Sequence, residues 1–337
     1  MSLNSLIQIM QPAIEDELVA SLSLSGGERF EEFHYMMAYH LGWEGAGAGP
    51  EARGKRIRPL MVLLTTAAAG ADWRVALPGA AAVELIHNFS LIHDDIEDDS
   101  PLRRGRQTLW KLWGIAQAIN AGDAMFTLAH LAILRLADNV PIESAYTASR
   151  VLLQTCLQLT QGQYLDISYE GRGDLNLDAY WPMVGGKTAA LLAASTEIGA
   201  LAAQVDAKIC QAYHRFGWSL GLAFQAQDDQ LGIWGDAELT GKSAASDLLT
   251  GKKSLPVLYG LSQQGVFAER WHQGPLTADE LDWMAEQLEL EGGREYTQKV
   301  ANELTESALT ALEEAQPQGE AGAALGDLAL QLLSRHK

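Results

Sequence analysis

The chain has 337 residues, of which 47% are hydrophobic, and carries a formal net charge of −19. This length and apolar content allow a substantial buried core. The acidic balance, with a sequence pI near 4.7, leaves no basic stripe of the kind that neutralises nucleic-acid phosphates. We therefore expect no nucleic-acid partner.

Helical apolar patterns run almost without a break from Leu3 to Arg335, and strand-like alternation is scarce. They predict an all-α fold, in which one large antiparallel helical bundle over residues 1–337 forms a single domain around a central cavity. The apolar runs are interrupted by charges or glycines, so we expect a cytoplasmic protein with no stable membrane insertion. Loops are predicted where Gly and Pro gather, at 45–54, 100–106, 171–176, 235–253 and 316–322.

The first acidic cluster lies in a predicted helix over Ala81–Ser100. Asp94 and Asp98 are one turn apart and can reach a common set of metal ions, while Asp95 can orient bound water. His87 lies two turns before Asp94 on the same face, roughly 10 Å along the axis. It is too distant to share the metal but could hold a second anionic group, so this face predicts two substrate positions. A solvated acidic face and a structural core histidine are the simpler readings.

The second acidic cluster lies in a predicted helix over Phe216–Trp234. Gln225, Asp228 and Asp229 supply its polar groups, with a helix-capping or surface pair as the alternative for the two aspartates. Gly232 stands where a second DDxxD motif would carry its last aspartate. Magnesium commonly binds through one or two carboxylates, with phosphates and water completing its shell, so this loss weakens the cluster without abolishing it.

Basic residues follow in places suited to phosphate oxygens, although a lysine in a loop could serve solubility alone. In a chain this acidic, such cations indicate anion binding. They are Lys55, Arg58, Arg103, Arg104, Lys187, Lys242 and Lys252.

With these blocks in order, the chain resembles the trans-isoprenyl diphosphate synthases of the polyprenyl synthetase family, and is closest in motif to the short-chain geranylgeranyl diphosphate synthases. The resemblance covers most of the length and implies the isoprenoid synthase type I fold. The blocks that carry it are GKRIRP (54–59), ELIH (84–87), SLIHDDIEDDSPLRRGRQT (90–108), GQYLD (162–166), GKT (186–188), FQAQDDQLGIWGD (224–236) and GKSAASDLLTGKKSLP (241–256).

The resemblance implies a magnesium-dependent prenyltransferase that condenses isopentenyl diphosphate head-to-tail with allylic diphosphates. Three Mg²⁺ ions per active site are expected with substrate bound. The resemblance implies that isopentenyl diphosphate is bound by Lys55, Arg58, His87 and Arg104. It implies that the allylic diphosphate is bound by Arg103, Lys187, Lys242 and Lys252, and its magnesium ions by Asp94, Asp98 and Asp228, with Asp95 beside them. The reacting end of the site would be lined by Thr188 and Gln225.

Product length in the family depends on bulk at the fifth and fourth residues before the first aspartate, here Phe89 and Ser90. An aromatic residue followed by a small one resembles the archaeal-type geranylgeranyl synthases, so a C20 product is predicted, with C15 farnesyl diphosphate as the alternative.

Two other functions are alternatives, a terpene cyclase and a non-catalytic subunit. A terpene cyclase would not need Lys55, Arg58 and His87. A non-catalytic subunit would be expected to lack the first aspartates or the arginine pair. The family also implies a homodimer.

Overall fold

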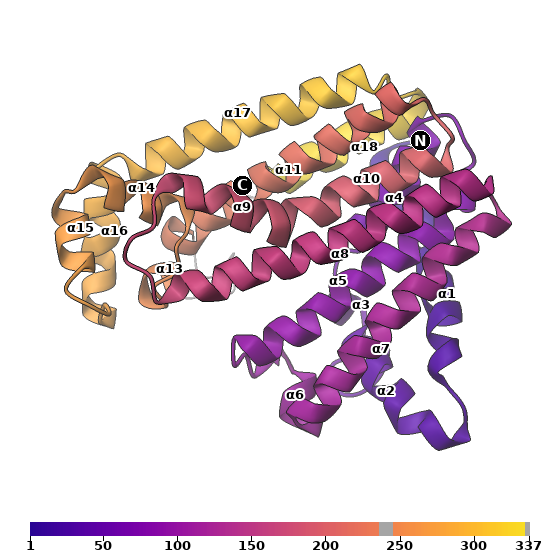
Figure 1. Cartoon of the computed structure of the whole chain (residues 1–337), viewed down its shortest axis with the longest axis horizontal. Helices are drawn as coiled ribbons and strands as arrows, with labels where there is room; N and C mark the ends of the chain where they lie inside the picture. The colour runs from indigo at the N-terminus through magenta and orange to yellow at the C-terminus, as the bar shows by residue number, and fades with distance from the viewer. Residues whose placement is uncertain (236–244, 334–337) are drawn as a thin grey trace. The chain divides into compact units, whose positions relative to one another are not determined.

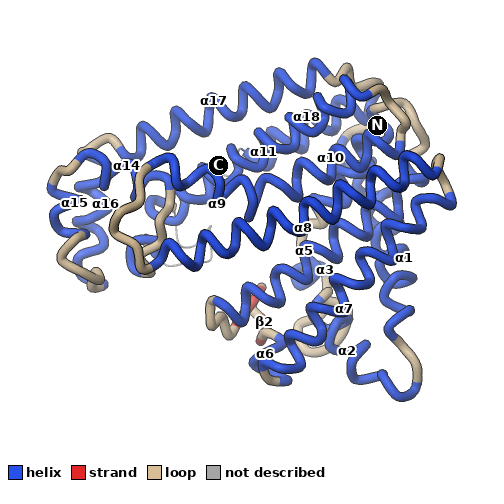
Figure 2. Tube along the Cα trace, viewed as in Figure 1, coloured by secondary structure: helices blue, strands red, loops and turns tan. Residues whose placement is uncertain are grey.

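The computed structural model describes residues 1–235 and 245–333. Helix dominates this part of the chain (Figures 1 and 2), which confirms the all-α prediction. Contacts between Cα atoms group the chain into two compact units. Unit 1 comprises Met1–Gln154, Ala194–Tyr213 and Ala315–Asp327, and unit 2 comprises Thr155–Ala193, His214–Glu314 and Leu328–Lys337. The single-domain organisation stays a prediction.

Most of unit 1 comes from the N-terminal half of the chain. Its α-helices are α1 (Leu3–Leu22), α2 (Glu31–His40), α3 (Pro50–Arg53), α4 (Ile57–Ala68), α5 (Leu77–Glu97), α6 (Leu109–Trp113) and α7 (Ile115–Leu134). Four 3₁₀ turns join them, η1 (Ser23–Ser25), η2 (Glu28–Phe30), η3 (Trp73–Ala76) and η4 (Arg135–Asp138), together with strands β1 (Leu102–Arg103) and β2 (Arg106–Gln107).

Helix α5 is the central element of unit 1, and it packs against α1, α4 and α7. Its first half is buried on all sides, as expected for the small and aliphatic run Gly79–Ile86. The spacing between α5 and α7 is close because Gly122 of α7 has no side chain: a Cβ atom there would overlap the His93 ring. The predicted helix over Ala81–Ser100 is therefore present, although it begins at Leu77 and ends at Glu97.

The predicted loop at 100–106 is partly a two-stranded hairpin, β1–β2 (Figure 2). Its two central residues, Arg104 and Gly105, both have positive φ, at 51° and 73°. That combination is typical of the tight type I′ turn, whose twist matches a hairpin. In the described residues three other predicted loops also contain helix, since α3 lies within 45–54, α13 (Ser246–Leu249) lies within 235–253 and α18 begins at Gly319.

Unit 2 contains the second acidic motif, at residues 228–232. Its elements are η5 (Leu177–Ala179), α9 (Tyr180–Val184), the π-helical segment η6 (Gly185–Ala189), α13 (Ser246–Leu249), α14 (Leu255–Gln263), α15 (Val266–Trp271), η7 (Ala278–Glu280), α16 (Leu281–Leu290) and α17 (Gly293–Glu314). Helices with residues in both units are α8 (Ile142–Glu170), α10 (Ala190–Ala202), α11 (Ala207–Trp234) and α18 (Gly319–Leu333).

Two apolar clusters hold unit 2 together. One includes Tyr180, Met183 and Leu255, and the other joins Ile233 at the end of α11 to Leu248 on α13 and to residues of α14–α16. The predicted helix over Phe216–Trp234 is the second part of α11. Of the predicted loop at 235–253, residues 236–244 lie outside the described residues.

One segment in the described part of the chain, Trp73–Glu97, is long and apolar enough to cross a membrane by length and composition alone. In its most apolar stretch 67% of the residues are buried within the protein. Core helices of proteins without a membrane span meet the same criterion, so this helix is read as part of the core.

Candidate functional site

The C-terminal end of α5 carries the first acidic cluster. Asp94 is half-buried, Asp95 is 1% exposed, and Asp98 is exposed at the residue that caps the helix. A helix C-terminus already carries partial negative charge, so carboxylates gathered there need cationic partners. Arg103 of the hairpin is one, because its Nε donates to Asp95 Oδ1 at 2.8 Å and its Nη2 forms an ion pair with the same oxygen, also at 2.8 Å. Desolvation raises the pKa of Asp95 to about 6 against the opposing charge of Arg103.

Two arginines from other elements, Arg58 of α4 and Arg104 of the hairpin, lie close to His87 of α5. Arg58 Nη1 is 3.2 Å from His87 Nε2, and desolvation together with the charges of Arg58 and Arg104 holds the pKa of His87 well below its ordinary value. His87 is therefore neutral at pH 7, and its Nε2 accepts from Arg58. Arg104 donates to the Ala52 carbonyl at 2.9 Å. Its guanidinium lies over Gly54, where a Cβ atom would be 2.7 Å from Cζ. Unit 1 thus brings together three of the four residues predicted for isopentenyl diphosphate.

The basic residues of the GKRIRP block have different environments. Lys55, the fourth predicted residue, is exposed. Arg56, in contrast, is 2% exposed and pairs through Nε with Glu15 at 2.7 Å and through Nη1 with Glu84 at 2.8 Å. Arg56 is therefore a structural residue that fixes the start of α4, and it leaves Lys55 and Arg58 on either side for other partners.

The two predicted chain-length residues point to different neighbours. The Phe89 ring lies 4.9 Å from the His93 ring and 5.1 Å from the Phe126 ring of α7, centroid to centroid. Ser90 Oγ donates to the carbonyl oxygen of His87 at 2.8 Å. The structure thus places the Phe89 ring against α7.

Asp229 is a buried carboxylate of unit 2 that is held by several hydrogen bonds. It is 1% exposed, and it accepts hydrogen bonds from the Tyr180 hydroxyl at 2.8 Å, the Leu255 amide at 2.9 Å and Gln225 Nε2 at 2.9 Å. Gln225 in turn accepts from Thr188 Oγ1 at 2.9 Å. Burial raises the pKa of Asp229, and the charge of Lys252 and the hydrogen bonds from Leu255 and Gln225 oppose that effect. The predicted residues Thr188 and Gln225 are thereby joined in one polar chain.

Lys187 and Thr188 lie on the π-helical segment η6, a local geometry often found at functional sites. Lys187 pairs with Asp166 of α8. The backbones of η6 and α8 approach closely at two glycines, because a Cβ atom at Gly186 would be 2.9 Å from the Gly162 Cα and 2.5 Å from the Gln158 carbonyl oxygen. This backbone contact sets the position from which Lys187 extends.

Lys252 Nζ lies 3.7 Å from Asp229 Oδ1 and 3.7 Å from Asp247 Oδ2. Burial disfavours its charge, yet the charges of Asp229, Asp247 and the half-buried Asp228 outweigh burial and raise the pKa of Lys252. Unit 2 thus brings together Lys187, Lys252 and Asp228 of the predicted site. Lys242 lies outside the described residues.

The donors available for a metal are carboxylate oxygens, which suit magnesium. Among residues 1–235 and 245–333, no three His, Cys, Asp or Glu side chains are arranged to hold an ion by themselves. In the same residues, Asp95 Oδ2 is buried and has no hydrogen-bond partner. A buried carboxylate oxygen without a partner is costly unless something binds it. The residues therefore fit a cation whose shell is completed by substrate oxygens and water.

Comparison with known proteins decides the family. The polyprenyl synthetase family model matches residues 48–288. The (2E,6E)-farnesyl diphosphate synthase of Mycobacterium tuberculosis strain H37Rv is 44% identical over 77% of this chain and 74% of its own length. The geranylgeranyl diphosphate synthase of the same strain is 40% identical over 83% of this chain and 81% of its own. The chain belongs to the polyprenyl synthetase family.

A solved structure supports the same assignment for this polyprenyl synthetase. The polyprenyl synthetase of Streptomyces coelicolor A3(2) has a TM-score of 0.88 and 36% identity, and the match covers 98% of this chain and all of that one. The predicted enzyme class, a transferase of the short-chain isoprenyl diphosphate synthase type, is confirmed by the family and the relatives.

Sequence reasoning missed several residues of this polyprenyl synthetase that support the site. Asp166 lies in the GQYLD block, but nothing in the pattern showed that it pairs with Lys187. Tyr180 reads as an ordinary core aromatic until its hydroxyl is seen on Asp229. His40 carries no motif, yet desolvation and the charges of Arg103, Arg104, Arg56 and Arg106 lower its pKa to about 3.

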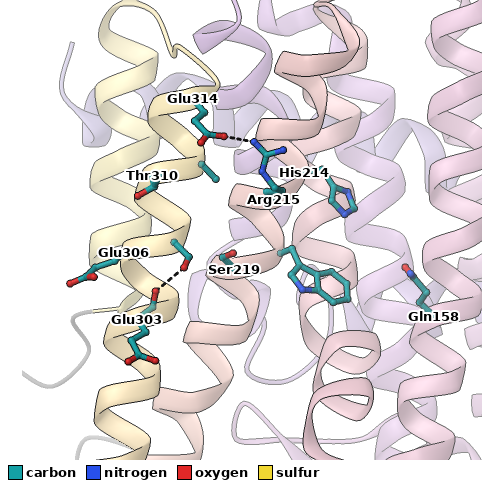
Figure 3. Close-up of a pocket in the computed structure, with 11 residues that line it drawn as sticks. Gln158, His214, Arg215, Ser219, Glu303, Glu306, Thr310 and Glu314 are labelled. Atoms are coloured by element: carbon teal, nitrogen blue, oxygen red, sulfur yellow. Dashed lines mark hydrogen bonds and ion pairs between the residues drawn. The ribbon is translucent and has the colours of Figure 1, made fainter. Parts of the chain in front are cut away.

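A cavity of about 910 Å³ lies along α11 and α17 of unit 2. Figure 3 shows Arg215 of α11 paired with Glu314 of α17 at one end, and His214, whose ring is stacked on Trp218. None of the predicted site residues is among its described lining, and its walls are rich in glutamate. It therefore does not suit an acidic substrate.

Proposed function

We propose that this polyprenyl synthetase condenses isopentenyl diphosphate head-to-tail with allylic diphosphates and produces geranylgeranyl diphosphate. The observation that supports this best is the placement of two sets of side chains at different points along α5. The carboxylates at its end suit a cation and diphosphate, and the Arg58–His87–Arg104 cluster suits a second anion without a metal. A cyclase closes a single allylic chain and binds no second diphosphate substrate, so it would not need the Arg58–His87–Arg104 cluster.

Each set has a proposed role toward its substrate. Lys55, Arg58, His87 and Arg104 would hold isopentenyl diphosphate through its diphosphate. Arg103, Lys187, Lys242 and Lys252 would hold the allylic diphosphate, and Asp94, Asp98 and Asp228 would bind its magnesium ions, with Asp95 orienting their water. Magnesium bound there would stabilise the negative charge of the leaving diphosphate.

The chain's own residues then govern the fate of the allylic cation. Lys187 and Arg103 would keep the departing diphosphate in place, since both are cationic side chains that extend from fixed backbone elements. Thr188 and Gln225, joined at 2.9 Å, would lie at the reacting end. Water must be excluded until the carbon–carbon bond forms. The proton lost afterwards would pass to the departing diphosphate, so no protein base is required.

The C20 product is proposed over C15 because a small residue, Ser90, directly follows Phe89 before the first aspartates. The named relatives include both a farnesyl and a geranylgeranyl synthase, so similarity alone does not choose between them. Phe89 packs against Phe126 of α7 and would close the far end of the product tunnel.

Product analysis tests this proposal. The purified protein is incubated with isopentenyl diphosphate and each allylic starter, with magnesium or with EDTA, and dephosphorylated products are identified by mass spectrometry. Magnesium-dependent geranylgeraniol supports the proposal, and farnesol keeps the chemistry but corrects the length. A cyclic hydrocarbon from one substrate alone indicates a cyclase, and no product with any starter indicates a non-catalytic subunit.

A matched pair of variants tests the role of the first aspartates. Asp98→Asn should lower kcat by about 10²–10³-fold, the size of effect found when one preorganised group that stabilises transition-state charge, such as an oxyanion-hole donor, is removed. Asp99→Asn removes the same charge from the next residue, which is also exposed and whose φ of 48° asparagine tolerates. It should leave kcat within a few fold. Equal losses in both variants would argue against a specific role for Asp98.

The length assignment predicts a change for Phe89→Ala. Removing the ring should open space beside Phe126 and shift the product toward chains longer than C20. Ser90→Phe, which fills the neighbouring position, should shift it toward C15. Chromatography of the dephosphorylated alcohols measures both, and an unchanged distribution in Phe89→Ala would remove Phe89 as the floor of the tunnel.

A further inference from the structure

The second acidic motif lacks its last aspartate, and the structure shows what lies in that place. Position 232 is one helical turn after Asp228 on α11, so a side chain there would share the face of Asp228. A Cβ atom built on Gly232 would be 2.5 Å from Cγ and 2.9 Å from Oδ1 of Asp247, and closer still to Oδ2. The Asp247 carboxylate therefore occupies the space that an aspartate at position 232 would use.

Local packing holds Asp247 in this position. Asp247 is 6% exposed and belongs to the short helix α13. Its neighbours Ala245 and Leu248 are buried in the same apolar cluster as Ile233 of α11. The packing of these apolar side chains fixes α13 beside the end of α11, which directs the intervening carboxylate toward Gly232.

Charge ties Asp247 to the rest of the motif. Lys252 lies 3.7 Å from both Asp247 and Asp229, and the charge of Asp228 also acts on it. Asp247 thus belongs to the same group of charges as the two aspartates of α11. A glycine at 232 is required for this arrangement, because any larger residue would overlap the Asp247 carboxylate.

We propose that Asp247 supplies the third carboxylate of the second acidic motif and acts as a positioning residue for the cation and diphosphate. This rests on the proposed function, in which Asp228 binds magnesium directly. Asp247 would accept hydrogen bonds from water around that ion. Such outer contacts typically change metal affinity by about 10–100-fold.

Exchange of the two positions tests the proposal. The variants are Asp247→Asn, Asp247→Ser, Gly232→Asp and the double variant with Gly232→Asp and Asp247→Ser. Mn²⁺ binding in the presence of inorganic pyrophosphate is measured by electron paramagnetic resonance, so the readout does not depend on turnover. Circular dichroism and thermal melting confirm that each variant is folded. Glu313→Gln, an exposed residue of α17, removes a charge from the same unit as the control.

We expect Asp247→Asn and Asp247→Ser to weaken Mn²⁺ binding at least 10-fold, and Glu313→Gln to leave it unchanged. Gly232→Asp alone should also weaken it, because two carboxylates then compete for one space. The double variant should recover binding to within about 3-fold of the wild type, since it moves the carboxylate rather than removing it.

Two results would overturn the proposal: wild-type affinity in Asp247→Asn, or a double variant that binds no better than Asp247→Ser. If Gly232→Asp fails to fold, the isosteric Asp247→Asn decides the matter alone. Failure of the proposed function looks different, because the wild-type protein would then show no Mn²⁺ binding that depends on pyrophosphate.

Discussion

Single buried polar groups organise both units at the level of residues. Asp229 takes hydrogen bonds from three elements of unit 2, and His87 accepts from Arg58 in unit 1. The spacing of the aspartates and of His87 indicated which residues matter, because helical periodicity places them on one face. It could not indicate partners such as Tyr180 or Asp247, since contacts between residues far apart in the sequence depend on tertiary packing.

The network around Asp229 predicts a stability loss for Tyr180→Phe. The change removes one donor from a buried carboxylate without changing the ring, and should lower the free energy of unfolding by about 1–3 kcal/mol. Urea denaturation measures it. Tyr164→Phe, at a ring that is 70% exposed in the same unit, should change stability by less than about 0.5 kcal/mol. Equal effects would mean that the Tyr180 hydroxyl contributes nothing to Asp229.

His40 predicts a pH dependence of stability. Its pKa in the folded protein is about 3, because of desolvation and the charges of Arg103, Arg104, Arg56 and Arg106, against an ordinary value of 6.5. Above pH 6.5 both states hold a neutral imidazole. As the pH falls below 6.5, only the unfolded state gains the proton, so stability is lost progressively toward pH 3. Between pH 7.5 and 5.5 this loss should be about 1.4 kcal/mol.

Urea denaturation midpoints are measured at pH 7.5 and pH 5.5 for the wild type and for His40→Gln. The difference between the two proteins separates the contribution of His40 to the stability loss from that of the carboxylates. The variant should lose less stability on acidification. His272→Gln, an exposed histidine of unit 2, serves as the control and should follow the wild type. Parallel profiles for all three proteins would contradict the assignment to His40.

At the level of elements, short irregular segments carry the cationic side chains. The β1–β2 hairpin presents Arg103 and Arg104, and the π-helical η6 presents Lys187. The long helices were predictable from apolar periodicity. The hairpin was assigned to a loop, because two residues per strand are too few to show alternation, and the π turn has no sequence period of its own.

The close approach of η6 and α8 predicts a specific effect of Gly186→Ala. The added methyl group would meet the Gln158 carbonyl and the Gly162 Cα, so we expect a stability loss of about 1–3 kcal/mol. KM for the allylic diphosphate should also rise, because Lys187 extends from the displaced segment. Gly171→Ala, where no heavy atom lies within 4 Å, should change neither quantity. Steady-state kinetics and urea denaturation report the two effects.

At the level of the whole molecule, the family resemblance implied a homodimer, which we retain as a proposal. Its support in unit 1 is the set of exposed apolar side chains on two consecutive helices, since large apolar patches commonly mark interfaces. On α7 these are Ile115, Ile119, Leu131 and Leu134, and on the first part of α8 they are Ile142, Tyr146 and Leu153. Periodicity alone could not separate this surface from core, because both are apolar at helical spacing.

Light scattering after size-exclusion chromatography tests the dimer. The 36.5 kDa chain should elute at about twice its mass, and Tyr146→Asp, which adds a charge to the exposed apolar surface, should shift it to the monomer. Leu290→Asp replaces an apolar side chain that is 73% exposed on α16 and should remain dimeric. A monomeric wild type would contradict the proposal.

The ion pair between Arg56 and Glu15 sets a lower limit on how far the molecule can be shortened. The family match begins at residue 48, yet the buried guanidinium of Arg56, at the start of α4, draws one of its two carboxylate partners from α1. Removing one partner of a buried ion pair costs about 3–5 kcal/mol. A fragment trimmed to residues 48–288 would lack Glu15 and incur that loss, so α1 is as much a part of the working enzyme as the matched region that it supports.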